Sequence, residues 1–546
     1  MKNCDPRDIA IKSFFLGPQS ENGEWLKKKW ISILENWISW RRDLFPGDGA
    51  AISAEDQNNA NFKAALKKLE NELDSVLHEL ENETPKFSPR YIGHMVSEVS
   101  LPALLGHASA LLHNPNIISK KVSSVVTRLE DEAIADLAKM LNFPPHAQGH
   151  FTSGGTLANF EALWHAIVRA DSAFGEKGFL ALGPWQWAAE YERQNGRAFP
   201  GFVILVPGNK HYSWEKAVML MGLGANTFWS VALDSDGRMD PKDLDLKIQQ
   251  ANKEGRPILM VVSVVGTTEM GEVDPVDQVQ DLLDQYYKKG QSLWHHVDAA
   301  YGGYFTTMLE DEELEKNLDP KIAKALRSMS RADSVTLDPH KLGYVPYACG
   351  AFIVRDEKNY QTRAATADYL QTDKDNRWKY TLEGSRSGAG ATATWLSNRV
   401  LGLNADGYGR LLNKGLEARN LIVTELQNII PDILIVHPID LNIVCFSIAP
   451  NASKLSQINE TTERIWRHFE TSPNFSVSKT VLHAKQYAPL MERLANQRSI
   501  KMDVHAWHQI RLVLMNPFLA SKETKTNYIS DFVKELLSIT SPTPRV

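Results

Sequence analysis

The chain has 546 residues, of which 43% are hydrophobic, 23% charged and 9% aromatic. This composition is typical of a folded globular protein and excludes disordered and fibrous classes. The 60 Lys and Arg residues against 66 Asp and Glu residues give a net charge of −6, and without a basic block we expect no nucleic-acid partner.

The cysteines and the N-terminal sequence narrow the class further. Cys4, Cys349 and Cys445 are widely separated and form no CxxC motif, so neither a disulfide framework nor a zinc knuckle is indicated. The first residues contain no apolar signal region, and no stretch approaches the roughly 18 apolar residues of a membrane span. We therefore expect a cytoplasmic enzyme with no membrane partner.

The first 85 residues predict two amphipathic helices. Apolar residues from Trp25 to Trp37 recur at helical spacing until Pro46-Gly47 stops the pattern, and a second stripe runs from Phe62 to Leu80. Such stripes must be covered by other apolar surface. Two interpretations remain open: the helices pack on the chain's own core, or they form an arm that clasps a second subunit.

From about residue 146, short apolar runs alternate with polar helical segments. The runs that predict buried parallel strands are residues 202–206, 258–265, 293–297 and 350–354. This alternation indicates an α/β fold with a central, mostly parallel sheet covered on both faces, whose ligands collect at the carboxyl ends of the strands. We predict a helical N-terminal segment over 1–145, a large α/β domain over 146–404 and a small C-terminal α/β domain over 405–546.

Lys341 is the first candidate site residue. It follows a short apolar strand and lies among apolar and aromatic residues, in the segment SVTLDPHKLGYVPYACG. Desolvation lowers the pKa of an amine and makes it a usable nucleophile, as a Schiff-base lysine requires. The alternative is an ordinary buried ion pair, but the neighbouring His340 and the turn at Asp338-Pro339 favour a site.

Two further segments carry the groups that an aromatic phosphate cofactor needs. Asp298 ends a predicted strand, where a carboxylate can keep a pyridine nitrogen protonated, although a helix-capping role is also open. The TSGGT turn at 152–156 runs into a helix. Its glycines, hydroxyls and free N–H groups can cradle a phosphate, although a plain capping turn would look the same.

His211 follows the strand at 202–206 and so lies at the same predicted edge of the sheet. A flat imidazole can stack on an aromatic cofactor, whereas a lone histidine is more often a satisfied core residue. Hydroxyls at Thr267 and Thr268 follow another strand. The HHVD segment lacks matching ligands at metal spacing, so we predict no metal.

Together these groups describe a pyridoxal phosphate site. The motifs DPHKLGYVPYACGAF, HVDAAYGGYF, TSGGTLANFEAL and NKHYSWEKA resemble the group II pyridoxal-phosphate-dependent amino-acid decarboxylases, which have the fold type I (aspartate aminotransferase-like) architecture. The resemblance extends from about residue 85 to about 520. Within the family, HMVSEVSLPALLGHASALLHNPN and YTLEGSRSGAGATATW are most similar to bacterial tyrosine decarboxylases.

The resemblance implies residue roles and a homodimer with shared active sites and intertwined N-terminal helices. Lys341 would hold the cofactor through a Schiff base, His211 would stack on its ring, and Asp298 would pair with the ring nitrogen. Ala300 would pack beneath the ring and Thr267 would lie near it. The phosphate would be bound by Gly155, Thr156 and His340, and by Ser385 of the partner subunit.

The resemblance also implies that a tyrosine on a loop returns the proton to the substrate. Tyr369 falls 28 positions after Lys341 and matches it. The segment Gln371–Arg377 that follows is more polar than the corresponding loop of tyrosine decarboxylases. This departure bears on side-chain specificity rather than on the chemistry.

The expected activity is that of a carboxy-lyase that releases carbon dioxide and an amine, with L-tyrosine as the first candidate substrate. Tyr91 and His94 are the candidate substrate contacts. Glutamate or aspartate would instead require an arginine in the pocket, and Arg386 has an alternative structural role. Another fold type I lyase or an aminotransferase, and a cofactor-binding protein without turnover, are the remaining alternatives.

Overall fold

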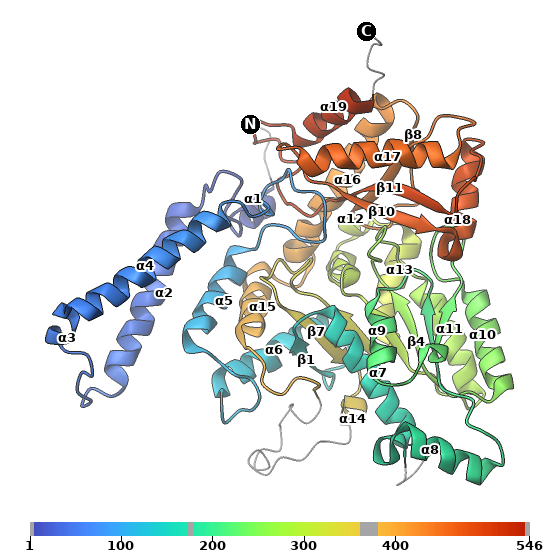
Figure 1. Ribbon diagram of the computed structural model, residues 1–546, viewed down its shortest axis with the longest axis horizontal. Helices are drawn as coiled ribbons and strands as arrows, with labels where there is room; N and C mark the ends of the chain where they lie inside the picture. Colours follow the sequence, from blue (N-terminus) through green and yellow to red (C-terminus); the bar gives the residue numbers. More distant parts are fainter. Residues whose placement is uncertain (1–4, 173–177, 361–380, 541–546) are drawn as a thin grey trace.

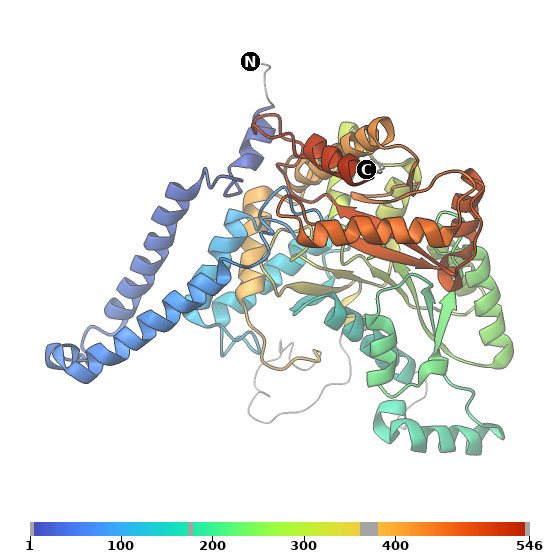
Figure 2. The ribbon, with the colours of Figure 1, turned by 45° about the horizontal axis from the view of Figure 1, so that its top comes forward.

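The computed structural model describes residues 5–172, 178–360 and 381–540. A two-sheet body carries a long helical arm near its N-terminus (Figures 1 and 2). Among these residues, no helix combines the length and the apolar character needed to cross a membrane.

The larger sheet has seven strands in the order β1-β7-β6-β5-β4-β2-β3. β2 to β6 run parallel, while β7 is antiparallel to both β6 and β1. The carboxyl ends of β1, β2, β4, β5 and β6 therefore meet at one edge. The bounds are β1 Gln148–Thr152, β2 Val203–Pro207, β3 Phe228–Val231, β4 Ile258–Val264, β5 His295–Asp298, β6 Ser334–Leu337 and β7 Gly350–Val354.

Helices cover both faces of this sheet because its strands are apolar on both sides. Ile204 and Val206 of β2 pack in one cluster with α7 (Gly155–Ser172) and α9 (Ser213–Leu220). Val203 and Leu205 of the same strand pack in another with α10 (Pro241–Glu254) and α11 (Val276–Lys288). The predicted α/β fold with a mostly parallel sheet is confirmed.

A second sheet of four antiparallel strands lies in the C-terminal part, in the order β10-β11-β9-β8. Its strands are β8 Ile433–Ile435, β9 Ile443–Ile448, β10 Ser478–His483 and β11 Ala506–Val513. The helices α16 (Arg410–Ile429), α17 (Leu455–Thr471) and α19 (Tyr528–Thr540) share an apolar core with it. The predicted domain boundaries stay a prediction.

The arm consists of α2 (Gly23–Leu44), α3 (Ala54–Asn58) and α4 (Ala60–Leu80), which extend away from the body (Figure 1). The two long helices were predicted, but no residue of α2 or α4 is buried. The interpretation in which their stripes pack on the chain's own core is therefore wrong for this chain.

The remaining helices complete the body. They are α1 Pro6–Lys12, α5 Leu101–His113, α6 Ser124–Met140, α8 Phe179–Asn195, α12 Glu312–Glu315, α13 Pro320–Ser328, α14 Glu357–Tyr360, α15 Ala389–Leu401 and α18 Ala484–Gln497. Within the described ranges, 3₁₀ helices lie at Ala225–Thr227, Gly302–Glu310 and Met329–Arg331, and a π-helix lies at Ala405–Gly409.

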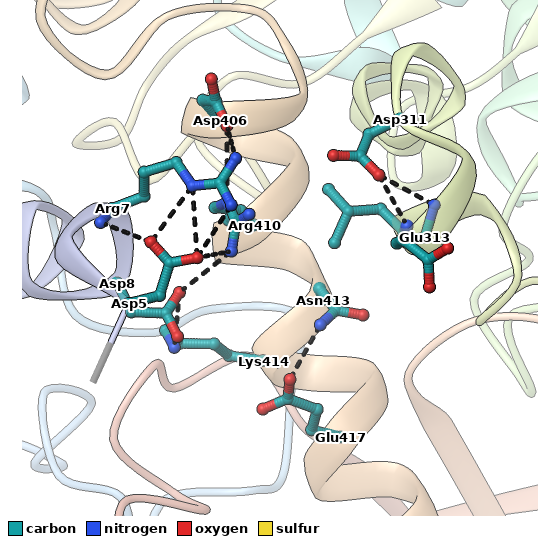
Figure 3. Close-up of polar contacts among 11 residues, drawn as sticks. Asp5, Arg7, Asp8, Asp311, Glu313, Asp406, Arg410, Asn413, Lys414 and Glu417 are labelled. Atoms are coloured by element: carbon teal, nitrogen blue, oxygen red, sulfur yellow. Dashed lines mark hydrogen bonds and ion pairs between the residues drawn. The ribbon is translucent and has the colours of Figure 1, made fainter. Parts of the chain in front are cut away.

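α1 is held against the start of α16 by charge pairs (Figure 3). The guanidinium of Arg7 lies 2.9 Å from Asp406, and that of Arg410 lies 3.3 Å from Asp5. Lys414 lies 3.5 Å from Asp8. Most of these side chains are in contact with water, so the pairs set the direction of the chain entering the arm more than they stabilise the fold.

Candidate active site

A cavity of about 510 Å³ opens at the edge where the carboxyl ends of the parallel strands meet. Seven of the predicted site residues line it: Gly155, Thr156, His211, Asp298, Ala300, His340 and Lys341. They come from four separate segments, which lie at or just after the carboxyl ends of β1, β2, β5 and β6. The topology therefore brings together residues that are up to 186 positions apart in the sequence.

Lys341 points into this cavity beside a carboxylate. Its Nζ lies 2.9 Å from Oδ2 of Asp338, whose side chain is only 3% exposed. Burial disfavours the ammonium, but Asp338 outweighs burial and the pKa of Lys341 is raised. The sequence predicted that desolvation would lower the pKa of Lys341, and this lowering is not found. The reason is that the ion pair considered as an alternative, Lys341 with Asp338, is itself part of the site.

Asp338 is the shared partner of the two basic residues after β6. Burial would raise its pKa, but Lys341 and His340 outweigh that and lower the pKa to about 2. His340 lies over the ring of Tyr347, with ring centres 4.1 Å apart, and its Nδ1 accepts a hydrogen bond from the N–H of Cys349. The segment from Asp338 to Cys349 is therefore one rigid wall of the cavity.

The turn before α7 has the form of an anion cradle. Gly154 has φ +156°, and a Cβ on Gly155 would lie 2.8 Å from Oδ2 of Asp338. Only glycine fits this close approach between the turn and the Lys341 segment. The first N–H groups of an α-helix have no partner within the helix, so those of Gly155 and Thr156 at the cavity face are available to a phosphate.

Asp298 is buried at the end of β5 and accepts three hydrogen bonds. Its Oδ2 accepts from the amide of Asn159 at 2.8 Å and from the indole N–H of Trp214 at 3.3 Å. Its Oδ1 accepts from the N–H of Ala300 at 3.3 Å. These three hydrogen bonds hold the carboxylate in one orientation at the cavity wall.

His211 also lines the cavity, and its Nδ1 lies 2.9 Å from Oγ of Ser213. Burial lowers the pKa of His211. Thr267, predicted to lie near the cofactor ring, instead donates its hydroxyl to Glu272 and is not among the lining residues. The adjacent Thr268 lines the cavity, because the backbone turns between the two residues.

Other predicted residues lie away from the cavity or outside the described ranges. Tyr91 and His94 do not line the cavity, whereas the next residue, Met95, does. Ser385 is exposed and accepts a hydrogen bond from Asn116 at 2.9 Å, a position that leaves its predicted role toward a partner subunit untested. Tyr369 and the segment Gln371–Arg377 lie outside the described residues.

Arg386, considered for an acidic substrate, has a structural role. It is buried, its guanidinium lies 2.5 Å from Glu130, and it donates to the carbonyl of Phe151. Sequence reasoning missed Asn159, Tyr212 and Tyr347, which also line the cavity. Each of them stands inside a motif quoted above, so position within a motif was the available signal.

Comparison with known proteins agrees with this geometry. The family model described as the pyridoxal-dependent decarboxylase conserved domain matches residues 64–449. The chain belongs to this family. The decarboxylase is 29% identical to an L-tyrosine decarboxylase of Levilactobacillus brevis, over 89% of this chain and 86% of that protein. It is 28% identical to an aspartate 1-decarboxylase of Aliivibrio fischeri, over 81% and 78%.

Solved structures confirm the fold. Mouse CSAD in its apo form superposes with a TM-score of 0.69 at 19% identity, covering 95% of this chain and 99% of that chain. The enzyme is therefore a pyridoxal-phosphate-dependent amino-acid decarboxylase of fold type I, as predicted. These comparisons confirm the resemblance inferred from the motifs, the carboxy-lyase activity and the cofactor. They do not identify which amino acid is the substrate.

The residues at the cavity fit pyridoxal phosphate. A nucleophilic lysine, a carboxylate for a ring nitrogen and a glycine turn at a helix N-terminus face one space. Oδ1 of Asp338 is buried without a hydrogen-bond partner among the described residues, so the cavity wall retains an unused acceptor. Lys341 could hold the aldehyde carbon, and Gly155, Thr156 and His340 could hold the phosphate.

Proposed function

We propose that the enzyme decarboxylates L-tyrosine or a closely related aromatic amino acid. One observation carries the proposal: among the described residues that line the cavity, Lys341 is the single lysine or arginine. A substrate with an acidic side chain needs a second cation. The apolar and aromatic side chains of Met95, Leu157, Tyr301 and Tyr347 instead offer surface for an uncharged ring.

The two arginines considered for a substrate with an acidic side chain already have other partners. Arg386 pairs with Glu130. Arg511 is buried and donates to the carbonyls of Glu269 and Gly93 at 3.0 and 3.1 Å. Neither lines the cavity. The similarity to L-tyrosine decarboxylases over most of the chain points in the same direction.

We assign the cofactor contacts as follows. Lys341 would hold the cofactor through its amine and would release it to the amine of the substrate. His211 and Ala300 would contact the cofactor ring, and Asp298 would pair with the ring nitrogen. When bound, pyridoxal phosphate supplies an electron-withdrawing ring that accepts the electron pair left when carbon dioxide departs. A carboxylate facing the ring nitrogen would favour its protonated form, which that chemistry requires.

For the proton that returns to the substrate's α-carbon, the proposed donor is Tyr369. Its spacing from Lys341 supports this assignment, and a phenol is a competent general acid when it is positioned at the reacting carbon. The cavity-lining Tyr347 is a described alternative, because its ring lies against His340, next to Lys341. The two variants Tyr369→Phe and Tyr347→Phe separate these roles.

We further propose that the enzyme works as a homodimer through its arm. Large apolar side chains of α2 and α4 are exposed, including Trp30 and Leu69, which are 41% and 64% accessible. Contiguous apolar helix faces of this kind mark association surfaces. A second copy of the chain is the occupant that the family resemblance implies.

The test of the substrate assignment is direct. The purified enzyme with added pyridoxal phosphate is incubated with each amino acid separately, and carbon dioxide and any amine are identified. Tyramine and carbon dioxide from L-tyrosine are expected. γ-Aminobutyrate or β-alanine as the main product would overturn the aromatic assignment, and release of a keto acid or an aldehyde would contradict decarboxylation as the main reaction.

A further inference from the structure

Asn159 lies at the centre of the site, although the cofactor contacts proposed above do not include it. It is 1% exposed and lies on α7, four residues after the glycine turn. Its amide nitrogen donates to Oδ2 of Asp298 at 2.8 Å and to Oγ of Ser213 at 3.0 Å. Ser213 in turn contacts Nδ1 of His211. One amide group is thus linked to both residues that are assigned to the cofactor ring, directly to Asp298 and through Ser213 to His211.

The orientation of that amide is itself determined by a partner. Oδ1 of Asn159 accepts a hydrogen bond from the hydroxyl of Thr336 at 2.9 Å. If the amide were turned over, its oxygen would face the carboxylate of Asp298 and its nitrogen would face the Thr336 hydroxyl. Two acceptors would then oppose each other in a buried space, which is costly.

Behind Thr336 the polar groups form a single directed chain. The indole N–H of Trp294 donates to Oγ of Ser334 at 2.9 Å, so the Ser334 hydroxyl is free to donate to Nδ1 of His296 at 2.8 Å. Nε2 of His296 then carries the ring proton and faces Oγ1 of Thr336 at 3.2 Å. Burial lowers the pKa of His296 to about 3, so this histidine is neutral and has one ring proton.

The chain has the same direction at its other end. Because Ser213 accepts from Asn159, its hydroxyl proton is directed at Nδ1 of His211, and the N–H of Ser213 points at the same atom at 3.3 Å. Nδ1 of His211 is therefore an acceptor, and the neutral ring carries its proton on Nε2. The hydrogen bonds of this network are all consistent with this one direction, which favours one arrangement over its alternatives.

We propose that Asn159 is a positioning residue that holds Asp298 at the ring nitrogen and, through Ser213, holds His211 over one face of the cofactor ring, with its amide orientation set by Thr336 and the chain behind it. The proposal rests on the cofactor contacts assigned to Asp298 and His211. It does not depend on which amino acid is the substrate.

The decisive variant is Thr336→Val, which keeps the shape of the side chain and removes the hydroxyl that orients the Asn159 amide. We expect the affinity for pyridoxal phosphate to fall by about tenfold, the effect of losing one well-placed hydrogen bond. We also expect the absorbance maximum of the bound cofactor to shift, because Asp298 no longer faces the ring nitrogen in a single geometry. Thr336→Ser restores the hydroxyl and should return both quantities toward wild type.

The matched control is Thr462→Val. Thr462 is also fully buried, but its hydroxyl donates only to the carbonyl of Ile458 in its own helix. It should leave cofactor affinity and absorbance unchanged. Equal losses in Thr462→Val and Thr336→Val, or no rescue by serine, would overturn the proposal.

Asn159→Leu and Asp298→Ala separate this proposal from the assignments on which it rests. If Asp298→Ala weakens cofactor binding and shifts the absorbance while Thr336→Val and Asn159→Leu do neither, the positioning role is wrong and the role of Asp298 stands. If Asp298→Ala itself leaves affinity and absorbance unchanged, the assignment of Asp298 is wrong, and the positioning role is overturned with it.

Discussion

The cavity and the N-terminal arm differ in the side chains that they bury and expose. Around the cavity, polar groups such as Asp298, Asn159 and Thr336 are buried and satisfied by one another. Along the arm, large apolar side chains such as Trp30 and Leu69 remain 41% and 64% exposed to water. The first region is nearly complete within one polypeptide. The second leaves apolar surface exposed, and the proposed homodimer would cover it.

Replacing the anchoring lysine should have the largest effect. Lys341→Ala removes the nucleophile while the surrounding core is untouched, so amine production should fall by at least about a thousandfold. The visible absorbance of the covalently held cofactor should be lost in the same variant. Circular dichroism serves as the control for folding. Retained absorbance with an unchanged spectrum would show that another residue is the anchor.

Removing the proposed proton donor should come next. Tyr369→Phe should reduce amine formation by about 10²- to 10⁴-fold, the usual contribution of a general acid, while cofactor binding persists. The measurement is amine yield beside cofactor absorbance, with Tyr347→Phe as the comparison. Near-normal yield from Tyr369→Phe would contradict the assignment, and a large loss in Tyr347→Phe alone would transfer it to Tyr347.

The arm is tested by placing charge on its apolar face. Leu69→Asp combined with Leu73→Asp should leave the body folded, because both side chains are exposed within one chain. It should convert the dimer to a monomer, as measured by sedimentation velocity. Lys68→Asp on the same helix is the matched control and should remain dimeric. A wild-type enzyme that sediments as a monomer would contradict the proposed homodimer.

A buried carboxyl near the cavity gives a pH-dependent prediction of intermediate size. Burial raises the pKa of Glu161 to about 7 from its ordinary value of 4.5, although the N–H of Leu382 opposes this. The folded state therefore holds this proton more tightly than the unfolded state does. The protonated Glu161 carboxyl therefore contributes fully to the free energy of unfolding below pH 4.5, and this contribution is lost as the pH rises through 7.

Glu161→Gln removes this titration. Relative to the variant, the wild-type free energy of unfolding should fall by about 3 kcal/mol between pH 4.5 and pH 7. Urea unfolding at several pH values measures the difference. Glu72→Gln on the exposed arm should track the wild type throughout, and identical pH profiles for wild type and Glu161→Gln would show that Glu161 does not carry this proton.

The smallest effect is expected where α1 meets α16. Arg7→Ala removes the contacts to Asp5 and Asp406, which are solvent-exposed, so the thermal midpoint and the activity should match those of the wild type. A clear loss of stability would mean that this surface network holds the arm in place.

Much of the site was predictable because its residues occur in local sequence patterns. An apolar strand followed by a lysine, an aspartate or a glycine turn places each group at one edge of a parallel sheet, and Lys341, Asp298 and Gly155 lie there. Thr267 was misplaced because adjacent residues in a turn point in different directions. Asn159 was missed because nothing in its own segment reveals its partners on β5 and β6.

The sequence by itself determined the α/β class, the long helices of the arm and the identity of seven cavity residues, because periodicity and strand-end chemistry are local properties. Only the tertiary structure decided which side chains share a proton or a hydrogen bond. The pairing of Lys341 with Asp338, the Glu130 partner of Arg386 and the network around Asn159 depend on how distant strands and helices pack. Hydrogen bonds act only over short distances in space, and sequence spacing does not record those distances.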